Sequence, residues 1–221
     1  SEMCIRDRIH TWVNRALQKA QEKVEGRNFE IRKSLLRFDD VMNDQRKAIY
    51  EQRKELMQVN DISETIINMR NEIIDDLVTI NVPEKAYAEQ WNLESLNISL
   101  KKLGLDLPIN DWAKKDGVTE KEFKQFIKEA AENKITKKVD IFGIENMQNI
   151  EKQVMLQVVD QNWKEHLLQL DQLKQGIGLR AYAQRDPLNE YKSEAFNLFQ
   201  VMLENIRNQT TTILLLSLIH I

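Results

Sequence analysis

The residues best suited to chemistry lie in one short segment, GIGLRAYAQRDP, at residues 176–187. Its polar and aromatic side chains are Arg180, Tyr182, Gln184 and Arg185. Glycines on one side and a proline on the other enclose Tyr182, so a hydrophobic core cannot easily absorb its ring. An exposed aromatic ring beside arginines is typical of a surface that binds peptide or nucleic acid. The pattern fits an ordinary polar loop equally well, and the residues alone leave both interpretations open.

Other residues that could carry chemistry have simpler structural explanations. His166 follows Glu165, but it lies on an apolar stripe, and no second histidine or cysteine stands at the spacing of a metal ligand. We therefore interpret His166 as a structural histidine that is hydrogen-bonded where helices pack. The sequence contains no Walker motif that could hold the phosphates of a nucleotide. We predict that this chain has no catalytic residue, no metal site and no cofactor of its own.

A second polar cluster is the segment RFDDVMNDQR at residues 37–46. Its candidate contact residues are Asp39, Asp40, Asn43, Asp44 and Arg46. They could form a contact strip for a partner domain or for an ATPase site. Spacing alone favours a solvated helix face with local charge pairs. Asp40 and Asp44 share one face of a helix while Asp39 points elsewhere, which argues against a divalent metal site.

Composition predicts an all-α protein. Of 221 residues, 42% are hydrophobic and 30% are charged, and only six glycines and three prolines interrupt the chain. The net charge of −3 argues against binding to nucleic acid. A single cysteine cannot form an internal disulfide, which fits a reducing compartment. No apolar run approaches the roughly 18 residues of a membrane-spanning helix.

Residues 9–57 predict one long helix, about 70 Å in length at 1.5 Å per residue. Apolar side chains recur every seven residues in two adjacent rows, namely Leu17, Val24, Ile31 and Phe38, and then Leu35, Met42, Ile49 and Leu56. A helix of this length cannot bury such a face alone, so we expect it to support other elements and to expose apolar surface in their absence. Gln45 and Gln52 continue the first row with polar side chains, which argues against a plain coiled-coil dimer.

A compact helical subdomain is predicted between the long helix and the segment of Tyr182. Two capping boxes, at residues 61–64 and 119–122, each predict a helix start. Short helices, Pro108 and the tryptophans Trp91 and Trp112 give residues 82–143 a texture of their own. We predict a scaffold helix over residues 9–60, this inserted unit over 61–143, and a scaffold return with a hairpin over 144–215.

The hairpin is predicted from two apolar stripes on either side of the segment of Tyr182. The first helix begins near Ile144, and we expect Gly176 and Gly178 to end it. Asp186 and Pro187 then supply an N-cap and a proline at the first helical position. Two such stripes pack most simply against each other as an antiparallel pair.

The two ends of the chain do not share the pattern of the rest. MCIRDR near the start and LSLIHI at the end can be encoded by nearly reverse-complementary DNA, similar to a transposon-based sequencing adapter. We therefore expect residues 1–8 and 216–221 to derive from an adapter. Cys4 and His220 then carry no functional weight, and the parent protein extends beyond both ends.

Three runs resemble the SecA family of bacterial preprotein translocase motors. They are VEGRNFEIRKSLLRFDDVMNDQRKAIYEQR (24–53), VMLQVVDQNWKEHLLQLDQLKQGIGLRAYAQRDP (154–187) and EYKSEAFNLFQVMLE (190–204). NLESL and LDLPINDW give a looser likeness between them. The resemblance covers about residues 9–215 and implies a helical scaffold, a helical wing and a two-helix finger.

The resemblance also implies function. In that family the finger enters the SecYEG channel and its tip tyrosine, matched by Tyr182, contacts the unfolded preprotein. Arg180, Gln184 and Arg185 would flank that contact, and the strip at residues 39–46 would face the motor domains. Those domains, which bind ATP and Mg, would precede residue 9, so this chain alone should not hydrolyse ATP.

The resemblance further implies a bacterial cytoplasmic protein that associates peripherally with the inner membrane, with its anionic surface as a further partner, and with no nucleic acid. The alternative is a stand-alone helical adaptor that binds only other proteins.

Overall fold

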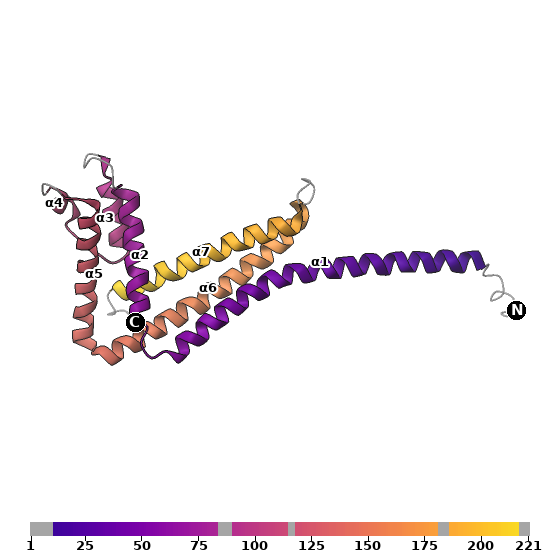
Figure 1. Ribbon diagram of the computed structural model, residues 1–221, viewed down its shortest axis with the longest axis horizontal. Helices are drawn as coiled ribbons and strands as arrows, with labels where there is room; N and C mark the ends of the chain where they lie inside the picture. The colour runs from indigo at the N-terminus through magenta and orange to yellow at the C-terminus, as the bar shows by residue number, and fades with distance from the viewer. Residues whose placement is uncertain (1–10, 84–89, 115–117, 181–185, 217–221) are drawn as a thin grey trace.

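The chain is all-helical in the computed structural model, which describes residues 11–83, 90–114, 118–180 and 186–216 (Figure 1). The α-helices of these residues are α1 (Thr11–Gln58), α2 (Ser63–Asn81), α3 (Leu93–Lys102), α4 (Ile109–Ala113), α5 (Glu120–Phe142), α6 (Ile144–Arg180) and α7 (Pro187–Leu215). Within those ranges there is no strand. The predicted all-α class is therefore confirmed.

Helix α1 is the predicted long helix, with 48 residues in one unbroken run. Its carboxyl-terminal half lies along α6, whereas its amino-terminal half extends away from every other helix in Figure 1. Apolar side chains on that extended half, such as Leu17, Val24 and Phe29, are exposed. The apolar face predicted from the heptad rows thus finds partners within this chain over only part of its length.

Helices α6 and α7 form the predicted antiparallel hairpin and lie side by side in Figure 1. The Asp186 side chain accepts a hydrogen bond from the Leu188 backbone N–H at 3.1 Å, and Pro187 opens α7, so the predicted cap is confirmed. The prediction that Gly176 and Gly178 end α6 is wrong, because the helix continues through both to Arg180.

Packing explains why the two glycines do not end α6. A glycine inside a helix costs about 1 kcal/mol relative to alanine. Ile177, which lies between them, is buried against Tyr191 and Ala195 of α7. Burial of one such side chain contributes roughly 1.5–3 kcal/mol, which offsets the cost of a glycine.

The inserted unit has its own hydrophobic core, which α2, α3, α4 and α5 share. Phe123 is fully buried, and Trp91 and Trp112 meet its ring edge-on with centroids 5.4 and 4.9 Å away. The predicted capping box at the start of α5 is confirmed, since Thr119 and Glu122 each bond the other's backbone N–H. The two tryptophans are half-buried, so they form the edge of this core rather than its centre.

The other predicted capping box, at residues 61–64, is wrong. Helix α2 begins at Ser63, and Ile62 occupies the cap position without a side-chain hydrogen bond to the backbone. Asp61 Oδ1 accepts from the Ser63 backbone N–H at 2.9 Å, and the Ser63 hydroxyl donates to Glu151 of α6 at 3.0 Å. A single bond from Asp61 to the first turn, together with the contact between Ser63 and Glu151, thus takes the place of a reciprocal capping box at this helix start.

Polar contacts join the inserted unit to the end of the hairpin. Lys138 of α5 is buried and its ammonium donates to the Leu214 backbone carbonyl of α7 at 2.6 Å. Burial lowers the pKa of Lys138 to about 8. Arg207 of α7 forms ion pairs with Glu72 and Asp76 of α2 at 3.1 and 2.8 Å. The insert and the hairpin base therefore form a continuous packed junction.

No helix in the described part of the chain is long and apolar enough to cross a membrane.

Candidate functional site at the junction of α1 with the hairpin

The predicted hairpin tip falls mostly outside the described residues. Tyr182, Gln184 and Arg185 lie in the segment between α6 and α7 that the structure does not describe. Arg180 is the last residue of α6, and its side chain is likewise outside the description. Their role as a contact surface stays a prediction. The structure instead describes the shaft of the hairpin and its attachment to α1.

The part of the hairpin nearest the tip packs on α1 through an aromatic contact. Phe38 of α1 meets the ring of Tyr191 of α7 edge-on, with centroids 4.9 Å apart. Tyr191 is only 2% exposed, and Leu170 of α6 and Ala195 of α7 complete the buried cluster around it. Burial raises the pKa of Tyr191, so its hydroxyl stays neutral. The cluster therefore fixes the distal shaft to the middle of α1.

An ion pair lies beside this aromatic contact. The Lys174 ammonium of α6 donates to Asp39 Oδ1 of α1 at 2.6 Å. Asp39 is thus directed at the hairpin, while its neighbour Asp40 is exposed. The pair can form because α1 and α6 lie close together here, and its partly exposed position limits its contribution to stability to at most about 1 kcal/mol.

The centre of the junction is a polar bridge made by Gln45, His166 and the backbone carbonyl of Ala195. Gln45 Nε2 of α1 donates to the Ala195 carbonyl of α7 at 3.1 Å. Gln45 Oε1 lies 2.7 Å from His166 Nε2 of α6. One amide of α1 therefore bonds both helices of the hairpin, and both hydrogen bonds lie within an otherwise apolar interface.

The polar bridge also determines which ring nitrogen of His166 carries the proton. A carbonyl can only accept, so the Gln45 nitrogen faces Ala195 and the Gln45 oxygen faces the imidazole. His166 Nε2 must then carry the proton, and Nδ1, which is buried without a partner among the described residues, carries none. His166 is 1% exposed between Trp163 and Phe199, and burial lowers its pKa. The predicted structural role of His166 is confirmed.

A further charged contact lies closer to the base of the hairpin. Arg53 of α1 donates to both carboxylate oxygens of Asp160 of α6, from Nε at 2.8 Å and from Nη2 at 3.1 Å. Lys152 of α6 donates to the Met57 and Val59 carbonyls at 2.9 and 2.8 Å, where α1 ends. Helix α1 thus contacts the hairpin at intervals from Asp39 to its own last turn.

Most of the remaining residues of the predicted acidic strip are exposed. Asp40, Asn43 and Asp44 are exposed, and Asp44 pairs only loosely with Lys47 at 4.0 Å. Arg46 is half-buried, with its guanidinium 4.0 Å from the Met42 sulfur. The strip therefore has two sides, one directed at the hairpin and one accessible to a partner.

The junction connects α1 to both helices of the hairpin through buried polar contacts. The described residues contain no group of three or more histidine, cysteine or acidic side chains that could hold a metal ion. The polar bridge instead joins three helices, and such buried, satisfied networks fix one arrangement of the elements around them. A displacement of α1 would therefore carry both helices of the hairpin with it.

Sequence reasoning missed the polar bridge, although a signal was present. Gln45 interrupts a row of apolar residues spaced by seven, a pattern that by itself argues only against a coiled coil. A polar residue within an apolar row is expected to have a hydrogen-bond partner once buried. His166, a polar residue within the apolar stripe of α6, was the matching half of that signal.

A long helix that supports an antiparallel hairpin and carries a small helical insert defines a helical scaffold module. Residues 9–217 match the family model described as the SecA Wing and Scaffold domain, and the chain belongs to this family. It is 53% identical over 207 residues to the protein translocase subunit SecA of Granulibacter bethesdensis (strain ATCC BAA-1260 / CGDNIH1). The match covers 93% of this chain and 23% of that protein, so the chain spans about a quarter of the length of its curated relative.

Proposed function

We propose that this chain is the part of an ATP-driven protein translocase that transmits movement from the motor domains to the hairpin. The observation that carries the proposal is the polar bridge, because Gln45 of α1 bonds both α6 and α7. The extended amino-terminal half of α1 and the outward side of the acidic strip supply surface for the motor domains. ATP and Mg would be bound by those domains, and this chain would not hydrolyse ATP.

The hairpin tip is the proposed contact with the unfolded preprotein. Membership of the SecA family supports this role for Tyr182, with Arg180, Gln184 and Arg185 beside it. The hairpin would act at the cytoplasmic mouth of the SecYEG channel, with the protein bound peripherally to the anionic surface of the bacterial inner membrane. Asp40, Asn43 and Asp44 would face the motor domains.

The coupling role is tested in an intact translocase that contains this segment. Gln45→Leu removes the polar bridge and preserves the approximate volume of the side chain. We expect preprotein translocation per ATP hydrolysed to fall several-fold, because α1 then moves with less effect on the hairpin. Gln52→Leu is the matched control, since Gln52 occupies the same heptad row and is exposed. An unchanged ratio of translocation to hydrolysis in Gln45→Leu would refute the coupling role.

The tip is tested separately. A photo-crosslinking amino acid at position 182 of the intact translocase should capture a preprotein arrested during transport. Tyr182→Ala should lower the transport rate, whereas Tyr50→Ala, which removes an exposed tyrosine from α1, should not. Crosslinks to neither preprotein nor channel would remove the contact role of Tyr182.

The adaptor alternative is distinguished by the DNA upstream of residue 9. A motor core with a Walker motif in the same reading frame supports the translocase. A native start codon immediately before residue 9 would support the adaptor instead.

A further inference from the structure

An open groove of about 520 Å³ lies where the last turns of α1 meet α2 and the hairpin. Its apolar floor includes Leu56 of α1, Met69 of α2, Met155 of α6, and Leu203 and Ile206 of α7. The volume lies within the range of roughly 300–1,000 Å³ that is typical of binding pockets. Unbranched methionine side chains also adapt to apolar partners of different shape. The groove is therefore suited to accept apolar side chains from another surface.

The rim of this groove is acidic. Glu55, Asp61 and Glu72 line it, and all three are exposed. The described lining contains one basic side chain, Arg207, which already forms ion pairs with Glu72 and Asp76. Three carboxylates against one guanidinium give the lining a net charge of −2. An apolar floor with an acidic rim is complementary to an amphipathic helix that carries an excess of basic residues.

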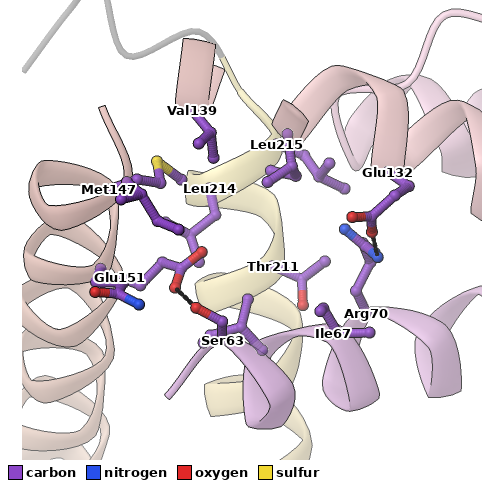
Figure 2. A pocket seen from close by; sticks show the side chains of 14 residues that line it. Ser63, Ile67, Arg70, Glu132, Val139, Met147, Glu151, Thr211, Leu214 and Leu215 are labelled. Carbon is purple, nitrogen blue, oxygen red and sulfur yellow. Dashed lines mark hydrogen bonds and ion pairs between the residues drawn. The ribbon is translucent and has the colours of Figure 1, made fainter. Parts of the chain in front are cut away.

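Contacts on the opposite face of α2 hold that wall of the groove in place. Figure 2 shows these contacts, in which the Ser63 hydroxyl donates to Glu151 of α6 at 3.0 Å and Arg70 pairs with Glu132 of α5. The groove is thus formed before any partner arrives. A preformed site loses less conformational freedom on binding, which favours association.

Residues 17–37 of α1, which we call the arm, have the matching chemistry. Leu17 and Val24 are exposed and are spaced by seven, so they share one face of the helix. Six basic side chains of the arm outnumber three acidic ones, which gives a net charge of +3, and all of these side chains are exposed. Arg27 follows Val24 by three residues and so lies beside the apolar face. The arm is therefore a basic amphipathic helix.

The arm cannot reach the groove of its own chain. Both lie on α1, which is one unbroken helix, and Val24 is about 48 Å from Leu56 at 1.5 Å per residue. The arm also extends away from every other helix in Figure 1, which leaves it accessible to another molecule. A second copy of the chain supplies both a groove for this arm and an arm for this groove.

We propose that the groove binds the arm of a second copy, so that two chains exchange arms and close into a two-fold dimer. The arm and the groove wall lie at opposite ends of α1, so two antiparallel α1 helices form both contacts at once, and the dimer is closed. This docking site goes beyond the transmission of movement proposed above, and the motor domains would compete with it for the arm. A dilute chain keeps its arm exposed, because association must offset the lost translational and rotational freedom.

Sedimentation equilibrium of the 221-residue chain tests the dimer. We expect reversible association of monomers into dimers, weaker at high salt because opposite charges attract across the interface. Val24→Asp should weaken dimerisation about tenfold or more, because it places a carboxylate against an apolar floor. Phe29→Asp is the matched control. Phe29 is 58% exposed and Val24 is 57% exposed, but the two lie about 140° apart around the helix.

The groove is tested by reversing one charge of its rim. Glu55→Lys should weaken dimerisation about tenfold, because like charges then meet across the interface. Glu51→Lys is the matched control, since Glu51 is exposed one turn earlier on α1 and does not line the groove. We expect the control to have a clearly smaller effect.

A photo-crosslinking amino acid at position 24 locates the contact in a mixture of isotope-labelled and unlabelled copies. Crosslinks between the two kinds of copy should join position 24 to residues that line the groove. The proposal fails if the chain stays monomeric at every concentration, if it forms open-ended assemblies, or if the crosslinks join arm to arm. It also fails if Val24→Asp and Phe29→Asp weaken association equally. No transport assay is involved, so such a failure leaves the proposed translocase role untouched.

Discussion

The two halves of α1 each carry apolar residues spaced by seven, but they have opposite environments. In the carboxyl-terminal half, Ile49 is 2% exposed and packs against the hairpin base. In the amino-terminal half, Val24 is 57% exposed, on the part of α1 that no other described element covers. The pattern thus specifies an apolar face, while the presence of a partner decides whether that face stabilises this chain. The carboxyl-terminal half of α1 therefore packs on the hairpin, whereas the amino-terminal half leaves its apolar face free to pack on another surface.

The largest expected difference between the halves is the cost of removing apolar volume. Ile49→Ala should lower the free energy of unfolding by about 3 kcal/mol, because it leaves a cavity between α1 and the hairpin. Val24→Ala should change it by less than about 0.5 kcal/mol, because the side chain is already in water. Urea denaturation followed by circular dichroism measures both. Equal losses would show that the extended half is also packed, for example against a second copy of the chain.

Loss of the polar bridge should have the second-largest effect on the free energy of unfolding. Gln45→Leu leaves the Nε2–H of His166 buried without its acceptor, which should cost about 2 kcal/mol. Gln52→Leu, seven residues along the same row, should be nearly neutral because Gln52 is exposed. The same denaturation experiment applies. A cost for Gln52→Leu that matches that of Gln45→Leu would erase the distinction between a buried amide and a solvated one.

Low pH should weaken the packing of the carboxyl-terminal half of α1 on the hairpin and leave the exposed amino-terminal half unchanged. Burial holds the pKa of His166 below its ordinary value of 6.5, so the unfolded chain binds a proton more readily than the folded one. The contribution of neutral His166 to the free energy of unfolding is complete above about pH 6.5, the pKa in the unfolded chain. It is lost as the pH falls from there through the lower pKa that His166 has in the folded chain. Unfolding measured from pH 8 to pH 5 should show this decline, and His166→Gln should reduce it. A decline of unchanged size in His166→Gln would assign it to other groups.

The smallest expected contrast lies between adjacent residues of the acidic strip. Asp39→Asn loses the ion pair with Lys174 and should cost about 0.5 kcal/mol, and high salt should reduce that cost. Asp40→Asn should have no measurable effect, because Asp40 is exposed. Denaturation at low and high salt tests the pair. In an intact translocase, Asp40→Asn should have the larger effect of the two substitutions if Asp40 contacts the motor domains.

Much of the fold could be predicted from local signals in the sequence. The spacing of apolar residues and the capping motifs correctly predicted the long helix, the hairpin and the start of α5. These features depend on residues that lie close together in the chain. The end of α6 could not be predicted in this way, since burial of Ile177 against Tyr191 carries the helix past Gly176. At the start of α2, Asp61 bonds the Ser63 backbone N–H, but the Ser63 hydroxyl bonds Glu151, which is 88 residues away and could not be paired with it from local sequence.

The candidate site was predicted less completely than the fold. The resemblance to SecA identified the tip, but Gln45, Arg53 and Asp160 act through contacts that join residues more than 100 positions apart. Charge and amide groups of this kind are common on helix surfaces, so their types alone do not identify which of them meet. Only the interruption of an apolar row distinguished Gln45.

The position of Gln45 in α1 also limits how that helix can slide. A shift of α1 along the hairpin by one turn, about 5.4 Å, would place Val41 or Ile49 opposite His166, and neither side chain can form a hydrogen bond. The next amide in the same row is Gln52, seven residues and roughly 10 Å away. Register slips shorter than two turns therefore leave an imidazole unsatisfied. Helix α1 is consequently suited to tilt together with the hairpin as one rigid body, and poorly suited to slide along the hairpin in the direction of its own axis.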